Sequence, residues 1–200
     1  MTSTSVKTKS TGFPAWIGIA CMSLVAIASP AMAQRSAAAS TAPRAAVGAE
    51  LDLLPYASGG YYLSGWIGRE HFRLRPVVAK TTLPSFVVQD GFKNADLEVA
   101  ALIVDYFPRA DFRGWWIGAG VEHWRNRVEN EGNGGTARWN NTVATVGGGY
   151  VWQLGEHFCL NPWAAGHLVV GGPTRVSAGG ATHSPKRFTP EVSLKLGWRF

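Results

Sequence analysis

Apolar and polar residues alternate with a period of two from Ala46 to the last residue of this chain. Residues 192–200, VSLKLGWRF, show the pattern most clearly, because their apolar side chains fall on one side of an extended chain and Lys195 falls on the other. Such alternation predicts β-strands, and no segment after Ala46 has the spacing of an amphipathic helix. Eight strands are predicted, over residues 46–54, 61–68, 71–80, 96–107, 115–128, 142–152, 158–170 and 188–200.

The connections between these segments alternate between short and long. Short turns cover residues 68–70, 107–114 and 154–156, whereas longer polar loops cover 81–95, 129–140 and 173–187, with 55–60 as the short exception among the loops. Short turns at one end and long loops at the other are typical of outer-membrane barrels. The sequence therefore predicts an all-β fold: an eight-stranded antiparallel transmembrane up-and-down β-barrel with short periplasmic turns and longer extracellular loops.

Residues 1–33 have the order of a cleaved secretory signal peptide. A short basic head precedes the apolar, uncharged residues 11–29, and Ala31-Met32-Ala33 supplies a cleavage site. The alternative is a retained membrane helix, since the apolar run approaches the length that spans a bilayer. Residues 34–45 are predicted to be a flexible periplasmic lead-in, and residues 46–200 the barrel.

Composition excludes several classes of function. Loss of the signal peptide removes Lys7 and Lys9, which lowers the formal net charge from +6 to about +4. It also leaves Cys159 without a partner for an internal disulfide. This modest charge, without a basic helix or a recognition motif, argues against nucleic acid as a partner. No cluster of metal-ligating residues and no phosphate-binding loop is present, so no cofactor or metal is predicted.

Charged residues in the middle of the strands predict the lining of the barrel. An eight-stranded barrel is just wide enough for its own side chains, so charges inside it must pair. We expect Lys195 to pair with Glu50 or Asp52 where the last strand meets the first, and the paired charges to plug the lumen; the alternative is a narrow channel. The orientation of strand 96–107 stays open, because both of its faces are largely apolar. The predicted lumen charge network consists of Glu50, Asp52, Glu70, Arg73, Arg75, Glu122 and Lys195.

Basic residues gather toward the long-loop end. Lysine and arginine there would meet the phosphates of lipopolysaccharide, which they bind by charge-assisted hydrogen bonds. The alternative is that they are ordinary solvated loop charges. The candidate lipopolysaccharide contacts are Lys80, Arg125, Arg127, Arg175, Lys186 and Arg187.

Aromatic residues lie close to the short-turn end, as in the girdle of a membrane barrel. They are Tyr106, Trp115, Trp116, Trp152, Phe158, Trp198 and Phe200. An alternating last strand that ends in Phe200, behind a signal peptide, resembles the small eight-stranded outer-membrane proteins, the class of the OmpA transmembrane domain and OmpX. The resemblance covers residues 46–200 as an architecture and is specific only over 192–200. It implies an outer-membrane location and recognition of Trp198 and Phe200 by the barrel-assembly machinery.

The expected function is structural or interactional: membrane integrity, or binding and adhesion through the loops, by a monomer in contact with outer-membrane lipid and lipopolysaccharide. The alternative is a lipid-A-modifying barrel enzyme, an acyltransferase or deacylase, which uses a histidine with a serine and an acid. His183 precedes Ser184 and Glu122 precedes His123, but adjacent side chains point apart in an extended chain. His167 has no serine two positions away. No catalytic residue is therefore predicted.

Overall fold

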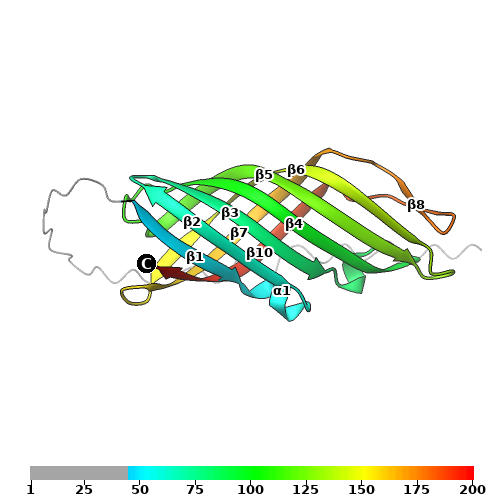
Figure 1. The fold of residues 1–200 in the computed structure, drawn as a ribbon, viewed down its shortest axis with the longest axis horizontal. Coiled ribbons are helices and arrows are strands. Elements are labelled where there is room, and N and C mark those ends of the chain that lie inside the picture. The colour runs from blue at the N-terminus through cyan, green and yellow to red at the C-terminus, as the bar shows by residue number, and fades with distance from the viewer. Residues whose placement is uncertain (1–44) are drawn as a thin grey trace, which may run out of the picture. The chain divides into compact units, whose positions relative to one another are not determined.

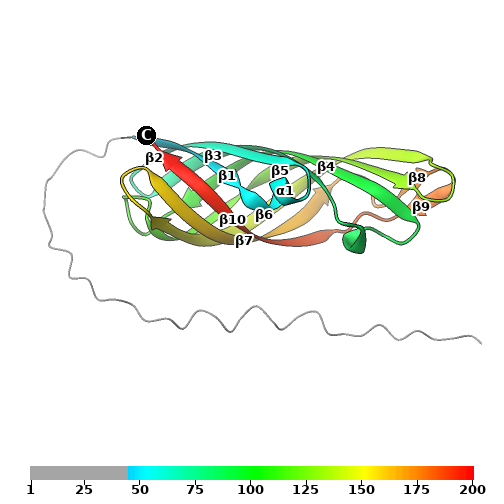
Figure 2. The same ribbon diagram turned by 90° about the horizontal axis from the view of Figure 1, so that it is seen from below.

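The computed structural model describes residues 45–200, which form a closed β-barrel (Figure 1, Figure 2). Around the barrel the strands follow the order β1-β10-β7-β6-β5-β4-β3-β2, and the neighbours are antiparallel. The predicted eight-stranded antiparallel barrel is confirmed. The predicted signal peptide lies outside the described residues, as does nearly all of the predicted lead-in. The barrel strands are β1 (Ala46–Asp52), β2 (Tyr61–Arg69), β3 (Phe72–Thr82), β4 (Phe92–Tyr106), β5 (Gly114–Asn130), β6 (Thr136–Gln153), β7 (Phe158–Gly171) and β10 (Phe188–Arg199).

The alternation of the sequence places polar side chains inside the barrel and apolar ones outside. On β3, Arg73 and Arg75 are buried, whereas Leu74 between them is exposed on the outer surface. On β4, whose orientation the sequence left open, Asp105 is buried in the interior and Val104 is exposed. A sheet of this kind buries charge and exposes apolar surface, which is the reverse of a water-soluble sandwich.

The outward apolar side chains form a continuous belt, called here the apolar band. On β3 the outward row is apolar over residues 72–78 and ends at Lys80, and on β10 it is apolar over 188–198 and ends below Lys186. One residue of the predicted girdle, Trp116, faces the interior instead. The other six girdle residues are exposed at the short-turn end: Tyr106, Trp115, Trp152, Phe158, Trp198 and Phe200.

The barrel wall is taller on the side of β5 and β6 than the sequence predicted. These strands continue to Asn130 and start at Thr136, so a tight turn replaces the predicted loop 129–140. The predicted loop 173–187 contains a small hairpin of β8 (Val176–Ala178) and β9 (Ala181–His183). The hairpin packs its apolar side chains on the extended strand ends, which explains why they stay ordered beyond the apolar band.

Strand β1 ends two residues earlier than predicted and is followed by a one-turn helix, α1 (Leu53–Ala57). The Asp52 carboxylate accepts a hydrogen bond from the backbone N–H of Leu54 at 3.1 Å and so caps the helix. A second short helix, η1 (Ser85–Val87), lies in the loop after β3. Within residues 45–200, no helix is long and apolar enough to cross a membrane.

Candidate functional site

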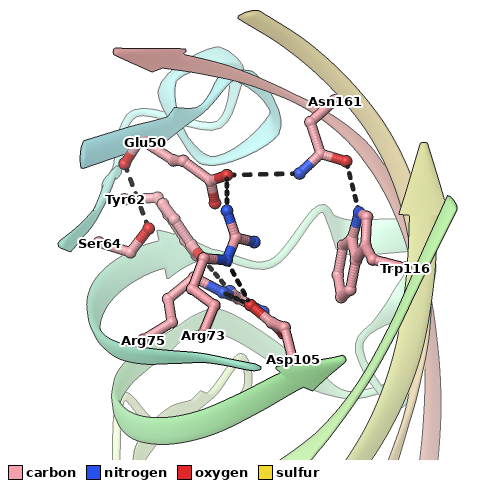
Figure 3. A network of polar contacts seen from close by, with 8 residues as sticks. All are labelled: Glu50, Tyr62, Ser64, Arg73, Arg75, Asp105, Trp116 and Asn161. Atoms are coloured by element: carbon pink, nitrogen blue, oxygen red, sulfur yellow. Dashed lines mark hydrogen bonds and ion pairs between the residues drawn. The ribbon is translucent and has the colours of Figure 1, made fainter. Parts of the chain in front are cut away.

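A buried group of charges crosses the barrel interior in its short-turn half (Figure 3). Arg73 on β3 donates to Glu50 on β1 at 2.8 Å and, through Nε, to Asp105 on β4 at 2.8 Å. Arg75 binds Asp105 with two hydrogen bonds of 2.9 Å and donates to the Tyr62 hydroxyl at 3.0 Å. The side chains of Glu50, Arg73 and Asp105 are at most 2 % exposed. Fork geometry and nearly complete burial make these strong ion pairs.

Aromatic side chains pack around the guanidinium groups and seal the barrel below them. The Arg73 guanidinium carbon lies 5.0 Å from the ring centroid of Phe107 and 5.3 Å from that of Trp66. Trp116 donates to the Asn161 side chain at 2.9 Å. A β-carbon at Gly149 would lie 2.9 Å from the Trp116 Nε1, so this glycine leaves the room that the indole needs. The apolar cluster at the short-turn end comprises Ala46, Trp66, Phe107, Phe112, Trp116, Val151 and Cys159.

Lys195 does not form the predicted ion pair with Glu50 or Asp52. Its Cα is the cross-strand partner of Asp52, yet within residues 45–200 its Nζ has no hydrogen-bond partner and lies 3.6 Å from the ring centroid of Trp163. Asp52 instead accepts hydrogen bonds from the Trp163 indole at 2.7 Å and from the Ser193 hydroxyl. Lys195 is therefore held by a cation–π contact in a set of three carboxylates and three cations: Glu50, Asp52, Asp105, Arg73, Arg75 and Lys195.

Two other predicted members of the lumen network lie elsewhere. Glu70 lies in the predicted short turn 68–70, where its positive φ of 57° turns the chain. Its side chain is exposed there, and its nearest cation is Arg69 at 3.8 Å. Glu122 faces the interior, but in the long-loop half, where its carboxylate lies 3.3 Å from Nδ1 of His167 and accepts from the Trp124 indole at 2.5 Å. The predicted single network is thus two groups at different depths.

His167 is the buried histidine that a hydrolase or acyltransferase would need, but its neighbours are two acids. Nε2 lies 3.0 Å from the carboxylate of Glu191, and Nδ1 faces Glu122. In the described part of the chain, no hydroxyl group hydrogen-bonds to this ring. His123 faces outward on β5 and is exposed. Among residues 45–200, no hydrogen bond joins a histidine ring to a serine hydroxyl.

The buried group of Glu50, Asp52, Asp105, Arg73, Arg75 and Lys195 is called here the charged plug. Between it and the loops lies a cavity of about 620 Å³, called here the outer cavity. Its floor includes Tyr62, Arg75 and Trp116, and its wall is mostly apolar, with Val77, Ala101 and Ile103 among the lining residues. Glu122, His167 and Glu191 are among its polar lining residues, together with Asn126, Arg127 and Asn141. The buried charges thus occupy the short-turn half of the interior, and this cavity lies in the long-loop half. A mostly apolar cavity of this size matches ligand pockets, which are usually about 300–1,000 Å³.

Two loops cover the outer cavity at the long-loop end. The Gln89 side chain donates to the backbone carbonyl of Thr182 at 3.4 Å and accepts from the backbone N–H of Ser184 at 2.9 Å. His183 lies between the rings of Phe92 and Trp139, with centroids 5.0 and 5.3 Å away. Burial lowers the pKa of the His183 imidazole below its usual value, so the ring is neutral at pH 7 and packs as an aromatic group. These contacts form a roof.

The predicted lipopolysaccharide contacts all lie on the long-loop half. Lys80 stands 3.4 Å from Glu98 and Arg127 stands 3.8 Å from Asp96, both as partly exposed pairs across neighbouring strands. The remaining four, Arg125, Arg175, Lys186 and Arg187, are exposed. Lys186 also lines the outer cavity.

Comparison with known proteins gives likeness in structure alone. No protein-family model matches the sequence, and no curated protein matches it. The N-terminal β-barrel domain of Pseudomonas aeruginosa OprF superposes with a TM-score of 0.52 at 16% identity, over 79% of this chain and 99% of that one. Neisserial surface protein A, NspA, superposes with a TM-score of 0.48 at 11% identity, over 78% of this chain and 94% of that one. The OprF likeness shows the fold: this chain has the architecture of a small eight-stranded outer-membrane barrel.

Proposed function

We propose that this chain spans a bacterial outer membrane as a non-conducting barrel and acts there in a structural or surface-binding role. The closed ring of eight strands supports the location, because it pairs most backbone groups of the spanning strands internally, as a bilayer requires. The apolar band supports it too, since it is bounded by aromatic residues at one end and by charged residues such as Lys80 and Lys186 at the other. The likeness to the OprF barrel domain points in the same direction.

The observation that carries the non-conducting role is the buried group around Arg73. Its ion pairs cross the lumen from β1 through β3 to β4, and the aromatic cluster closes the space beneath them. An ion would have to break pairs that are almost wholly excluded from water, which is costly. The short-turn half of the barrel therefore blocks the passage of ions, and binding takes place at the long-loop end.

The purified, folded barrel is expected to give no steady ohmic current in a planar lipid bilayer. The reason is that the inner seal leaves no continuous water path. A large-bore porin added to the same membrane serves as the positive control, and the folded state of the sample is checked by its heat-dependent gel mobility. A steady conductance of the folded barrel, proportional to voltage, would assign the role of a narrow channel instead.

The proposed partners are outer-membrane lipid and lipopolysaccharide at the rim, with the chain acting as a monomer. The exposed cations Arg125, Arg175 and Arg187 support lipopolysaccharide contact, because guanidinium groups bind phosphate with two parallel hydrogen bonds. Trp198 and Phe200 are both exposed on the outer surface of the short-turn end, 48% and 74% respectively. This exposure leaves them available as the proposed signal for the barrel-assembly machinery.

A further inference from the structure

The barrel wall has a gap in its long-loop half, on the side of β1. Strand β10 pairs with β7 over residues 188–198, but β1 pairs with β10 only from Lys195 onward. Likewise β2 pairs with β3 from Tyr61, but with β1 only from Ser64 onward. Residues 188–194 of β10 and 61–63 of β2 therefore have a neighbouring strand on one side only. These two free edges face one another across what is called here the seam.

The β10 edge of the seam is modified by a proline. Phe200 donates its backbone N–H to Val47 on β1, and Arg199 donates to His157 on the opposite side. Since the register with β7 is unbroken, the even-numbered residues of β10 direct their backbone groups toward the seam. Pro190 is one of them and has no N–H to offer. Proline on a strand edge discourages pairing with another strand, so the β10 edge resists the addition of a strand at the seam.

Helix α1 lies across the lower part of the seam and contacts β2, β3 and β10. Its backbone is satisfied locally: Asp52 caps its start, and the carbonyl of Pro55 accepts from the N–H groups of Ser58 and Gly60. The Ser58 hydroxyl also reaches the Thr81 hydroxyl on β3 at 2.6 Å. Leu53 and Leu54 are exposed, and Leu54 also lines the outer cavity. A short segment with satisfied polar groups and an apolar outer face can lie at lipid depth.

The seam lies within the apolar band. Strand β1 has seven residues. At about 3.3 Å per residue and a tilt of about 40°, it rises only about 18 Å along the barrel axis, whereas the apolar band of such barrels is about 25 Å tall. The outward row of β10 stays apolar up to Phe188, well above the end of β1. The free edge of β10 is therefore at the depth of the outer leaflet, rather than in water.

The outer cavity reaches both edges of the seam. Its lining includes Tyr62 of the β2 edge and residues 188–191 of the β10 edge, with Leu54 on α1 between them. The charged plug forms its floor and the Gln89 contacts form part of its roof. The direction left for a ligand is sideways, above α1 and between the free edges of β10 and β2.

We propose that the outer cavity holds one acyl tail of an anionic membrane lipid, which reaches it from the outer leaflet through the seam. This rests on the proposed membrane-spanning function and adds a ligand to it. The mostly apolar wall suits a hydrocarbon tail. Cations for the lipid phosphate lie on both sides of the seam, at the level where the apolar band ends. Lys80 lies near one edge, and Lys186 and Arg187 lie just before β10 on the other.

Photocrosslinking inside the barrel tests the proposal. The photoreactive residue benzoylphenylalanine replaces Trp124, which lines the outer cavity, or Trp66, which lies below the charged plug; both indoles are 8% exposed. Each variant is folded into vesicles of phosphatidylethanolamine and phosphatidylglycerol, irradiated and weighed as an intact protein. A phospholipid adduct is expected from position 124, and none above background from position 66.

A second pair of substitutions tests the route. Leu54→Glu puts a charge on α1 where it borders both the seam and the outer cavity. Leu53→Glu puts the same charge on the same exposed turn, but Leu53 does not line the cavity. In the position-124 background, Leu54→Glu should reduce the adduct about tenfold, since an apolar tail must pass the charge, and Leu53→Glu should leave it unchanged.

The outcomes separate the two proposals. Failure of the barrel to float with the vesicles and to show heat-dependent gel mobility would count against the membrane-spanning function itself. A barrel that inserts and folds but gives no adduct at position 124, or equal adducts at 124 and 66, overturns the lipid proposal alone. An adduct that Leu54→Glu does not reduce overturns the seam as the route. An adduct that forms only when free oleate is added overturns the membrane lipid as its source.

Discussion

Replacing Arg73 with alanine is expected to destabilise the folded barrel by about 3–5 kcal/mol. Arg73 is the side chain that joins Glu50 to Asp105, each at 2.8 Å, and all three are almost fully buried. Removing the guanidinium leaves the Glu50 carboxylate without its nearest cation, whereas Asp105 keeps Arg75. The cost comes mainly from this unpaired charge in a confined interior.

Urea unfolding of the barrel in lipid vesicles, followed by gel mobility, measures the effect. Arg69→Ala is the matched control, because Arg69 is an arginine of the neighbouring strand whose side chain is 70% exposed. Its removal should change the free energy of unfolding by no more than about 0.5 kcal/mol. Equal unfolding curves for Arg73→Ala and the wild type would mean that the charged plug does not hold the inner half of the barrel together.

Replacing Val146 with arginine is expected to cost about 2–4 kcal/mol if the apolar band lies in lipid. Val146 is 65% exposed on the outer surface of β6, near the middle of the band. Thr142→Arg is the control, because Thr142 faces outward on the same strand closer to the long-loop end. Near the interface the cost should fall to about 0–1 kcal/mol.

The comparison of these two variants, by the same unfolding measurement in vesicles, distinguishes a membrane barrel from a water-soluble one. In water an exposed valine can become arginine at little cost, so both variants would then match the wild type. If Val146→Arg lowered the free energy of unfolding less than Thr142→Arg, the middle of the apolar band would not lie at Val146 on β6.

Period-two alternation was sufficient to predict the barrel and the inward position of its lumen charges other than Glu70. The orientation of β4 was also within reach of the sequence, because a carboxylate such as Asp105 is costly on the lipid-facing side of a strand, yet the apolar character of both faces obscured it. The extension of β5 and β6 was missed because their polar ends are stabilised by the β8–β9 hairpin, a contact between residues far apart in the chain.

The partners of the buried charges could not be read from the sequence. Lys195 and Asp52 are indeed opposite one another, but which side chain reaches the Lys195 ammonium depends on the stagger between β7 and β10, which places Trp163 against it. The seam depends on a similar detail. Asp52 ends β1 by capping α1, so β1 stops well below the long-loop ends of β2 and β10 and leaves a free edge on each.

The most direct test of the membrane-spanning barrel is cysteine labelling from outside intact cells. In a Cys159→Ala background, Ser177→Cys places a thiol in the hairpin at the long-loop end, and Glu156→Cys places one in the short turn between β6 and β7. A membrane-impermeant maleimide should label position 177 in intact cells and position 156 only after the outer membrane is permeabilised. Labelling of both positions in intact cells, or of position 156 alone, would contradict the proposed location and orientation.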